Sequence, residues 1–439
     1  MAQSHSLQSD ASSFAAQLIE VALKAGAEAA EVFTERLLNR PVLFEANTLK
    51  QIETRDSEGV SLRLWVEGRP GLAVAYGEID PQKLVDTAIA LSQLNEPEAI
   101  ELTAIPPEIA DSEYGKSVEV PQLLAWGKTA LSGLNTPEFS DLQCVLELDT
   151  ETCTTSMLNS KGLACRYISH LTSIYGSTEW VRGEDFLCIE AEQTRHDTLD
   201  IPDFVDNMVK RLRWAKSRSR TPIGRMPVLF AGKAADILWT TVEAALSSKR
   251  VIENASPWSD RLGEPVVSPL LTLLQDPHIG PFGCPFDDEG ISTRRVKFIQ
   301  DGELQLFYTD RTTGKQLGCG STGNGFRPGL ERYPSPGLFN LMVSPGKDSF
   351  EDLVAKIQDG LIVDQFLGDS GSISGDFAIS VDLGYRVKKG KIVGRVKDTL
   401  VSGNVYEALN QVIALGSDAT WHGSCYTPSI LLDGLSVTA

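Results

Sequence analysis

The residue types best suited to metal or nucleophilic chemistry, histidine and cysteine, are few and scattered along this chain of 439 residues. A zinc peptidase builds its site from two histidines on one face of a helix and a further ligand. No two histidines here are spaced for one helical face, and no Cys-x-x-Cys occurs. The sequence therefore predicts no metal ligand and no catalytic residue in this chain. The histidines are His5, His170, His196, His278 and His422, and the cysteines are Cys144, Cys153, Cys165, Cys188, Cys284, Cys319 and Cys425.

Two shorter patterns could still hold a cation. The spacing His422-x-x-Cys425 offers two ligands, whereas structural zinc needs four, so Cys425 is interpreted as a buried reduced thiol. The run Asp287, Asp288, Glu289 could bind a hard cation such as Mg²⁺. Adjacent acids point in divergent directions on a strand or turn, so a solvated turn is favoured over a cation site.

The loop richest in glycine spans residues 318–327. It lacks the Gly-Lys-Ser/Thr ending of a phosphate-binding P-loop. Two interpretations stay open: the glycines let a peptide substrate or a partner subunit approach the backbone closely, or the loop is purely structural. The candidate peptide-cleft or subunit-interface residues in this loop are Thr322, Gly323, Asn324, Gly325, Phe326 and Arg327.

A second small-residue segment, 369–376, places three serines among glycines. A serine nucleophile needs a nearby histidine base, and the sequence indicates none, so a structural turn is favoured. Small polar side chains here could line a cleft. Ser374, Gly375 and Asp376 are therefore added to the candidate peptide-cleft or interface residues.

Charge and hydropathy exclude two classes of partner. The net charge is −19 and the pI is about 4.8, which argues against direct nucleic-acid binding. The basic run 210–220 is interpreted as the solvated face and C-terminal end of a helix. No apolar run reaches the roughly 18 residues of a membrane span, and residues 1–13 lack a signal pattern. We expect a cytoplasmic protein without membrane contact.

The elements that must position these residues follow a repeated order in the first half of the chain. Apolar spacing predicts helices over 11–25, 81–94, 121–134 and 202–218. Alternating runs predict strands at 30–35, 42–45, 60–66 and 71–76, and again at 144–151, 164–171, 173–181 and 186–193. Two tandem helix-strands-helix units result, at 1–95 and 117–221. Between them, the proline-rich residues 96–116 are interpreted as a linker.

The third region, 226–439, is predicted to be β-rich and mostly antiparallel, which makes the fold class α+β. It opens with a strand at 226–230 and a helix at about 233–247. Asp301-Gly302 between alternating runs is a strong hairpin signal. A second hairpin is predicted with its turn at 388–390.

The order and spacing of motifs in this region resemble the core of the TldD/PmbA family, whose members are also named modulators of DNA gyrase. The motifs lie at 285–290, 293–295, 301–304, 322–327, 374–377, 384–385 and 403–404, with further matches at 26–32 and 59–64. The resemblance implies peptidase subunits that process small or unfolded peptides. It also implies an active type, with His-Glu-x-x-x-His on the helix early in the third region and a C-terminal cysteine as a further zinc ligand.

The corresponding helix here, 234–246, has no histidine, and Glu243 is its only glutamate. A general base without a metal-bound water has nothing to activate. The chain therefore resembles the partner type, PmbA or TldE, which lacks the ligands and is not catalytic on its own. The resemblance implies zinc only in the active-type partner, and pairing either as a heterodimer with a TldD-like subunit or as a homodimer.

Two alternatives stay open at this point. One is an independent hydrolase with a non-standard site, such as Cys425 with His422. The other is a regulatory binding protein of the gyrase-modulator type, which the acidic charge disfavours for direct DNA contact.

Overall fold

A computed structural model describes residues 2–78, 80–139, 141–368 and 372–439, with side chains from residue 13 onward. The first half follows the predicted order of helices and strands except at β3 and β6, which were not predicted, and at β8, which replaces two predicted strands. The first set comprises α1 (Ala2–Lys24), β1 (Ala29–Asn39), β2 (Val42–Glu45), β3 (Thr48–Ile52), β4 (Arg55–Val66), β5 (Arg69–Tyr76) and α2 (Pro81–Ser92). The second comprises β6 (Asp111–Tyr114), α3 (Val120–Leu134), η1 (Pro137–Phe139), β7 (Gln143–Asn159), β8 (Ala164–Arg182), β9 (Asp185–Arg195) and α4 (Ile201–Trp214).

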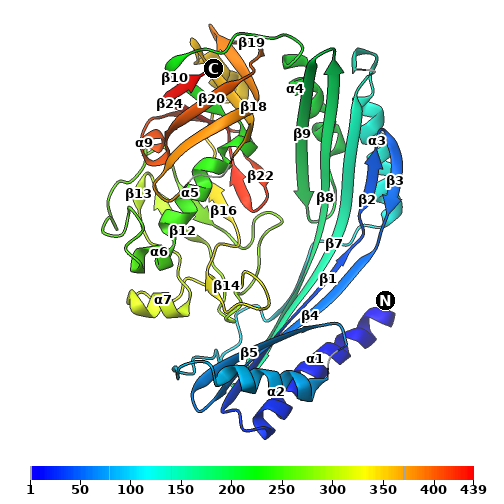
Figure 1. Cartoon of the computed structure of the whole chain (residues 1–439), viewed down its shortest axis with the longest axis vertical. Coiled ribbons are helices and arrows are strands. Elements are labelled where there is room, and N and C mark those ends of the chain that lie inside the picture. Colours follow the sequence, from blue (N-terminus) through cyan, green and yellow to red (C-terminus); the bar gives the residue numbers. More distant parts are fainter. Residues whose placement is uncertain (1, 79, 140, 369–371) are drawn as a thin grey trace.

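The strands of the two predicted units share one nine-stranded sheet (Figure 1). The long strand β7 joins them, because its C-terminal part pairs with β1 and its N-terminal part with β2. The two strands predicted at 164–171 and 173–181 are one continuous strand, β8, so that prediction was wrong. β8 pairs with β7 along almost its whole length, and nothing at Thr172 interrupts the ladder.

The predicted linker, 96–116, is only partly irregular. Its proline-bearing part forms no helix or strand, but residues 111–114 form β6, which pairs in parallel with β8. The interpretation of the whole segment as a linker therefore needs correction. It is also anchored, since the Asn159 side chain donates to the Thr103 carbonyl at 2.8 Å and the Thr103 hydroxyl donates to the Glu289 carbonyl.

Helices cover one face of the sheet at each end. Helices α1 and α2 pack on β1, β4 and β5 around Leu18, Leu62 and Val85. Helices α3 and α4 pack on β2, β7 and β9. The absence of a side chain at Gly127 permits this contact, because a Cβ there would lie 2.2 Å from the Phe44 ring.

The C-terminal half contains two larger sheets and one small hairpin, β14 (Gly325–Phe326) with β15 (Ser335–Pro336). Strand pairing closes a ring through five strands, to which β19 (Lys391–Arg395) and β21 (Val412–Leu415) are added. The ring strands are β10 (Gly224–Phe230), β17 (Asp359–Leu367), β18 (Asp376–Lys388), β20 (Thr399–Asn404) and β24 (Ile430–Thr438). The second sheet contains β11 (Leu273–Gln275), β12 (Val296–Gln300), β13 (Glu303–Leu304), β16 (Leu341–Val343), β22 (Thr420–His422) and β23 (Cys425–Thr427).

Both predicted hairpins are present. Asp301 and Gly302, with φ of 50° and 83°, connect β12 to β13, and Lys389-Gly390 connects β18 to β19. Most strand pairs are antiparallel; β10–β17 and β16–β23 are parallel. The α+β fold class is confirmed.

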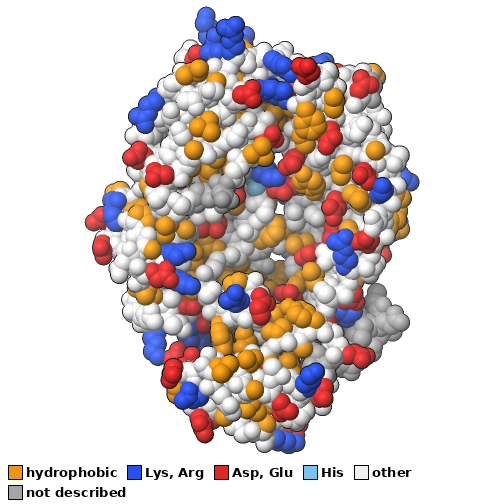
Figure 2. All heavy atoms as spheres, in the orientation of Figure 1, with side chains coloured by type: hydrophobic (Ala, Val, Ile, Leu, Met, Phe, Trp, Pro, Cys, Tyr) orange, Lys and Arg blue, Asp and Glu red, His pale blue; other side chains and the backbone are white. Residues whose placement is uncertain are grey.

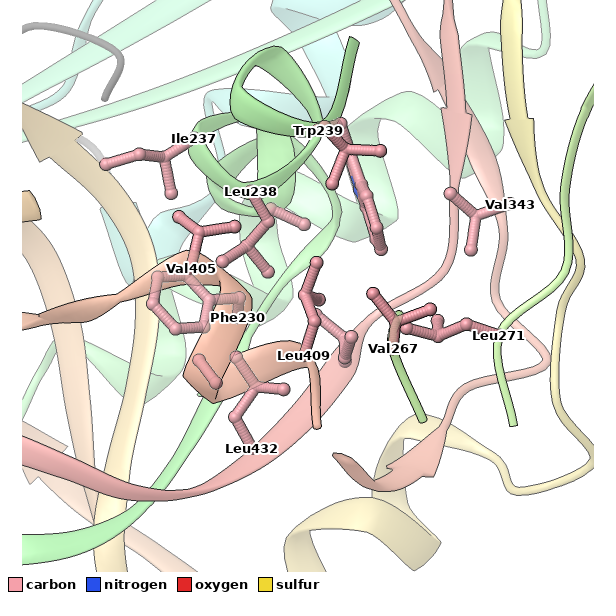
Figure 3. Packing of buried hydrophobic residues seen from close by; sticks show 14 of the residues in the cluster. Phe230, Ile237, Leu238, Trp239, Val267, Leu271, Val343, Val405, Leu409 and Leu432 are labelled. Carbon is pink, nitrogen blue, oxygen red and sulfur yellow. The ribbon is translucent and has the colours of Figure 1, made fainter. Parts of the chain in front are cut away.

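The core of this half forms around η2 (Gly232–Ala235) and α5 (Asp236–Leu246). Ile237, Leu238 and Trp239 on α5 are fully buried against strands of both sheets (Figure 3). Of the short helices in this half, α6 (Ser248–Ile252) and α9 (Val405–Leu409) contribute to this core. The others are α7 (Arg311–Gln316) and α8 (Phe350–Ala355), and α8 packs in the cluster that also contains α3 and α4. Because α5 is held on nearly all sides, its side chains have fixed positions.

Candidate functional site

The polar positions of α5 face the cysteine and histidine near the C-terminal end. Asp236 and Glu243 are the only carboxylates on this helix. Burial, and secondly the charge of Asp236, raises the pKa of Glu243 to about 7. Burial also raises the pKa of Asp236, although the nearby charge of His422 acts in the opposite direction. The helix thus presents weakly acidic carboxyls to this region.

Cys425 lies on β23 directly opposite His422 on β22. Burial, followed by the charges of Glu243 and Asp236, raises the pKa of the Cys425 thiol. A neutral thiol is a poor nucleophile and must lose its proton before it binds a metal. This environment disfavours a hydrolase that uses Cys425 as its nucleophile.

His422 contacts the opposing sheet. Its Nδ1 lies 3.7 Å from Glu192 Oε1 on β9, which is an ion-pair contact too long for a hydrogen bond. His422 and, secondly, Lys233 lower the pKa of Glu192. Gly232 leaves room for the imidazole, because a Cβ there would lie 2.4 Å from His422 Nε2. The sequence did not single out Glu192, although its period-two spacing with Glu190 places both on one sheet face.

These donors do not fit a zinc site. Among the residues that the structure describes, no three His, Cys, Asp or Glu side chains are grouped to hold a metal ion. His170 and His196 are engaged elsewhere: Nε2 of His170 lies 2.8 Å from Glu113 Oε1, and Nε2 of His196 lies 3.0 Å from the Gly280 carbonyl. The side chain of Trp239 fills the space beside α5, and its indole N–H donates to Thr427 Oγ1 at 2.8 Å.

The first part of the candidate loop, 322–325, is buried within the chain. The Thr322 hydroxyl lies 2.7 Å from Asn324 Oδ1, and the Asn324 side-chain N–H donates to Gln275 Oε1 at 2.7 Å. Gly323 has a φ of +78°, and a Cβ there would lie 2.6 Å from the Ser292 carbonyl oxygen. These contacts position the loop, so a direct contact of its buried residues with peptide stays a prediction.

The second part of the loop joins the two halves of the molecule. The Arg327 guanidinium donates to Glu31 Oε1 at 3.0 Å and lies over the Phe33 ring at 5.1 Å. Arg63 also donates to Glu31 Oε1 at 3.0 Å. We call Glu31, Arg63 and Arg327 the lower junction. Phe326 is half-buried, next to the junction.

The acidic run Asp287 to Glu289 is not the solvated turn that the sequence favoured; that interpretation was wrong. Asp287 is fully buried, and its carboxylate accepts backbone N–H groups of Gly325, Glu289 and Ile291. The turn is therefore closed by its own side chain. Burial raises the pKa of Asp288 to about 6, while the Arg327 backbone N–H, at 2.7 Å from Oδ2, acts against this.

Ser374, Gly375 and Asp376 lie apart from the loop 322–327. They precede or begin β18, in the other large sheet, and no hydrogen bond between described residues joins the two segments. Ser374 and Asp376 are exposed. The Asn404 side chain donates to the Ser374 carbonyl and to Asp376 Oδ1, both at 3.0 Å. Residues 369–371 of the serine segment lie outside the described residues.

The basic run 210–220 is also not simply solvated. Helix α4 ends at Trp214, before the predicted 218, and Arg211 is buried. Its guanidinium binds Asp364 in a fork, with Nε 2.8 Å from Oδ2 and Nη2 2.6 Å from Oδ1. The next residues approach the tip of the β8–β9 hairpin. There, Arg182, Arg218, Arg395 and Lys397 surround Asp185. We call this group the Asp185 cluster; together with Arg211 and Asp364 it forms the upper junction.

Between the two junctions the molecule is hollowed, as Figure 2 shows at its centre. Strand alternation turns Tyr175 of β8 and Glu190 and Glu192 of β9 toward the C-terminal half. Contacts confirm this direction, because Lys233 pairs with Glu190 at 3.5 Å and His422 lies beside Glu192. Tyr175 is 36% exposed. The sheet side of the hollow is therefore acidic and open to water.

Two family models match the chain. The model described as PmbA/TldA metallopeptidase C-terminal domain matches residues 223–439, and the model for domain 1 of the same metallopeptidases matches residues 30–92. A metalloprotease TldD homolog from Haemophilus influenzae is 30% identical over 224 residues, which are 48% of this chain and 46% of the relative. A metalloprotease PmbA homolog from the same organism is 26% identical over 289 residues, 64% of this chain and 61% of the relative.

Solved structures match over greater lengths. TldE from Thermococcus kodakarensis has a TM-score of 0.86 at 23% identity and covers 96% of this chain and 99% of its own. A Thermotoga maritima protein described as a modulator of a DNA gyrase has a TM-score of 0.85 at 22% identity, with coverage of 97% and 100%. At these identities the similarity shows the fold.

The chain spans about half the length of the curated relatives it matches, since the first matches cover 46% and 56% of those proteins. Within the described residues, no helix is both long and apolar enough to cross a membrane.

Proposed function

We propose that this chain, which belongs to the PmbA/TldD family of metallopeptidase-type proteins, has a subunit role in that family. In this role it is the metal-free subunit of a peptidase assembly. In this proposal a TldD-like partner subunit holds the zinc and carries out hydrolysis. The present chain completes the chamber in which small or unfolded peptides are cleaved. A homodimer of this chain is the alternative pairing.

The observation that carries the proposal is the donor set around α5. A catalytic zinc site uses three protein ligands with deprotonated donors. Here the side chains are a buried tryptophan, two carboxyls with raised pKa and a thiol with raised pKa. None of these groups belongs to a set of three donors placed to hold a metal ion, within the part of the chain that the structure describes. They support a role in which this chain shapes a chamber and leaves metal chemistry to the partner.

The hollow between the junctions supports the chamber role. Peptides that lack stable structure expose backbone groups and side chains that a wet, polar surface can accept. Tyr175, Glu190 and Glu192 offer such groups. Of the predicted cleft or interface residues, Ser374 and Asp376 are exposed and Phe326 is half-buried, so these three have the access that the role requires, whereas the Arg327 side chain is buried in the lower junction.

Co-purification with a TldD-like subunit tests the proposal. We expect a stable heterodimer that contains one zinc by elemental analysis, whereas the lone chain contains none. Cleavage of an unstructured peptide such as casein fragments should require the pair. As a matched control, Cys425→Ser in this chain should leave zinc content and cleavage unchanged. Stoichiometric zinc or cleavage in the lone chain would contradict the proposal, as would failure of the two subunits to associate.

A further inference from the structure

The Asp185 cluster gathers more cations than its carboxylate can neutralise. Nζ of Lys397 lies 2.7 Å from Oδ1, Nη2 of Arg218 lies 2.6 Å from Oδ1, and Nη2 of Arg182 lies 2.9 Å from Oδ2. Arg395 also contacts Oδ1. Four cations and one anion leave a formal excess of three positive charges, within a chain whose net charge is −19.

The acceptor capacity of Asp185 is already full. A carboxylate has about four lone-pair sites, whereas three guanidiniums and one ammonium bring many more N–H donors. Some donors find backbone carbonyls: Arg182 donates to Lys216 and Ala215, and Arg395 donates to Phe186. The remainder are surplus. In the described part of the chain, no acceptor is found for Nη1 of Arg218.

A second, independent observation concerns buried atoms. Arg395 is 2% exposed, and its Nε has no hydrogen-bond partner among the described residues; the buried Nε of Arg182 also lacks one. Buried N–H groups of native proteins are almost always paired with protein, water or an ion. Burial lowers the pKa of Arg395, and although the charge of Asp185 acts against this, the charges of Arg182 and Arg218 act in the same direction as burial.

The cluster is open to solvent on one side. The side chains of Arg218 and Lys397 are 52% and 39% exposed, while Asp185 and Arg395 lie beneath them. Arginine forks suit planar and tetrahedral oxyanions, and lysine adds a point charge. The residues come from the hairpin β8–β9, the segment after α4, and β19 with the residues following it (Figure 1).

We propose that the Asp185 cluster is a binding site for a small oxyanion of the phosphate or carboxylate class. The bound anion accepts hydrogen bonds from Arg218 and Lys397 and neutralises the cations that Asp185 leaves uncompensated. Because these cations belong to both halves of the molecule, the anion also stabilises the upper junction. This site is separate from α5, so its existence does not depend on the peptidase role.

Isothermal titration calorimetry of the full chain with inorganic phosphate tests the site, at an ionic strength held constant with sodium chloride. We expect saturable binding of one phosphate and a rise in melting temperature. Arg218→Gln and Lys397→Gln should each weaken binding about tenfold or more, since each removes a charge-assisted hydrogen bond. Lys391→Gln, an exposed lysine on β19 without an ion pair among the described residues, is the matched control and should bind as wild type does. Sodium acetate in place of phosphate distinguishes a carboxylate site from a phosphate site.

Asp185→Asn provides a sharper test. If Asp185 competes with the anion for the cations, this variant should bind phosphate more tightly than wild type, and phosphate should restore much of its lost stability. If the cluster is only a structural ion-pair centre, Asp185→Asn loses stability and gains no phosphate affinity. Absence of saturable binding, or equal binding by wild type and both Gln variants, would overturn the proposal. Those two variants retain the buried members of the cluster, so the test stands even where Asp185→Asn does not fold.

Discussion

At each of the two junctions between the halves of the molecule, one carboxylate is surrounded by more than one cation, but the junctions differ in the number of these cations and in their exposure. At the lower junction one carboxylate, Glu31, lies between two largely buried guanidiniums, next to the apolar cluster around Phe33 and Phe286. At the upper junction Asp185 carries four cations, of which two are well exposed. The ion pairs of the lower junction are therefore largely shielded from water, whereas water can solvate the exposed cations of the upper junction. The cost of breaking each should differ accordingly.

Glu31→Gln should have the largest effect on stability. It leaves the guanidiniums of Arg63 and Arg327, which are 14% and 3% exposed, without their carboxylate. Leaving buried charges uncompensated typically costs about 3–5 kcal/mol. Urea denaturation should show this as a lower midpoint. Glu45→Gln, at an exposed pair with Lys50, is the control and should change the midpoint little. If Glu31→Gln lowers the urea midpoint no more than the control does, the buried ion pairs of the lower junction do not stabilise the fold.

Asp185→Asn should cost less, about 1–2 kcal/mol, because water solvates the exposed cations once the carboxylate is lost. Burial alone would raise the pKa of Asp185, but hydrogen bonds from Arg218 and Lys397 and the charge of Arg395 hold it well below its ordinary value. Its stabilisation is therefore present above the unfolded-state pKa and disappears as the pH falls through the folded-state pKa. Urea midpoints of wild type and variant should converge on acidification. Midpoints that stay equally separated would contradict the comparison.

Asp288, beside the lower junction, should produce a pH dependence of the opposite sign. Its folded-state pKa of about 6 exceeds the ordinary 3.8, so its contribution is fully present below pH 3.8 and disappears as the pH rises through about 6. In Asp288→Asn this pH dependence of the unfolding free energy should vanish, a change of about 3 kcal/mol across the window. Chemical denaturation at several pH values measures it. An unchanged slope would mean that Asp288 ionises normally in the folded chain.

The smallest effect is expected at Lys210, whose ammonium pairs with Glu351 at 2.7 Å on the exposed surface near the upper junction. Lys210→Met should change stability by less than about 1 kcal/mol, because exposed ion pairs gain little. Arg211→Met at the adjacent position, which leaves the buried Asp364 unpaired, is the contrasting variant and should be clearly more damaging. Similar urea midpoints for the two variants would show that burial does not decide how much stability is lost when these ion pairs are broken.

Local patterns in the sequence predicted much of the fold. Asp301-Gly302 specified its hairpin because both residues accept positive φ. Apolar spacing located α2, α3 and α5, since each buries one face or more. The joining of β1 and β7 into one sheet was not predictable, because more than a hundred residues separate the paired positions and neither strand encodes its partner. The continuity of β8 was missed because its apolar pattern is irregular near Thr172.

The sequence predicted the candidate residues from their residue types, but residues from distant segments of the chain determine the surroundings of each one. The run 322–327 was singled out for its glycines, yet its burial depends on Asp287, Gln275 and Glu31, which come from distant segments. Neither Glu192 nor Asp236 lies in a motif, and the only local signal was the period-two spacing of Glu192 with Glu190. They share a site with His422 because the sheet and the C-terminal half meet there.

The amino-acid sequence alone determined the α+β class, the absence of histidine from residues 234–246 and the acidic net charge, because these depend on composition and short-range spacing. Only the tertiary structure decided which acids are buried and which cations they meet. The reason is physical: the pKa of Glu243 or Asp288 and the charge excess at Asp185 depend on desolvation and on neighbours that are far away in the chain.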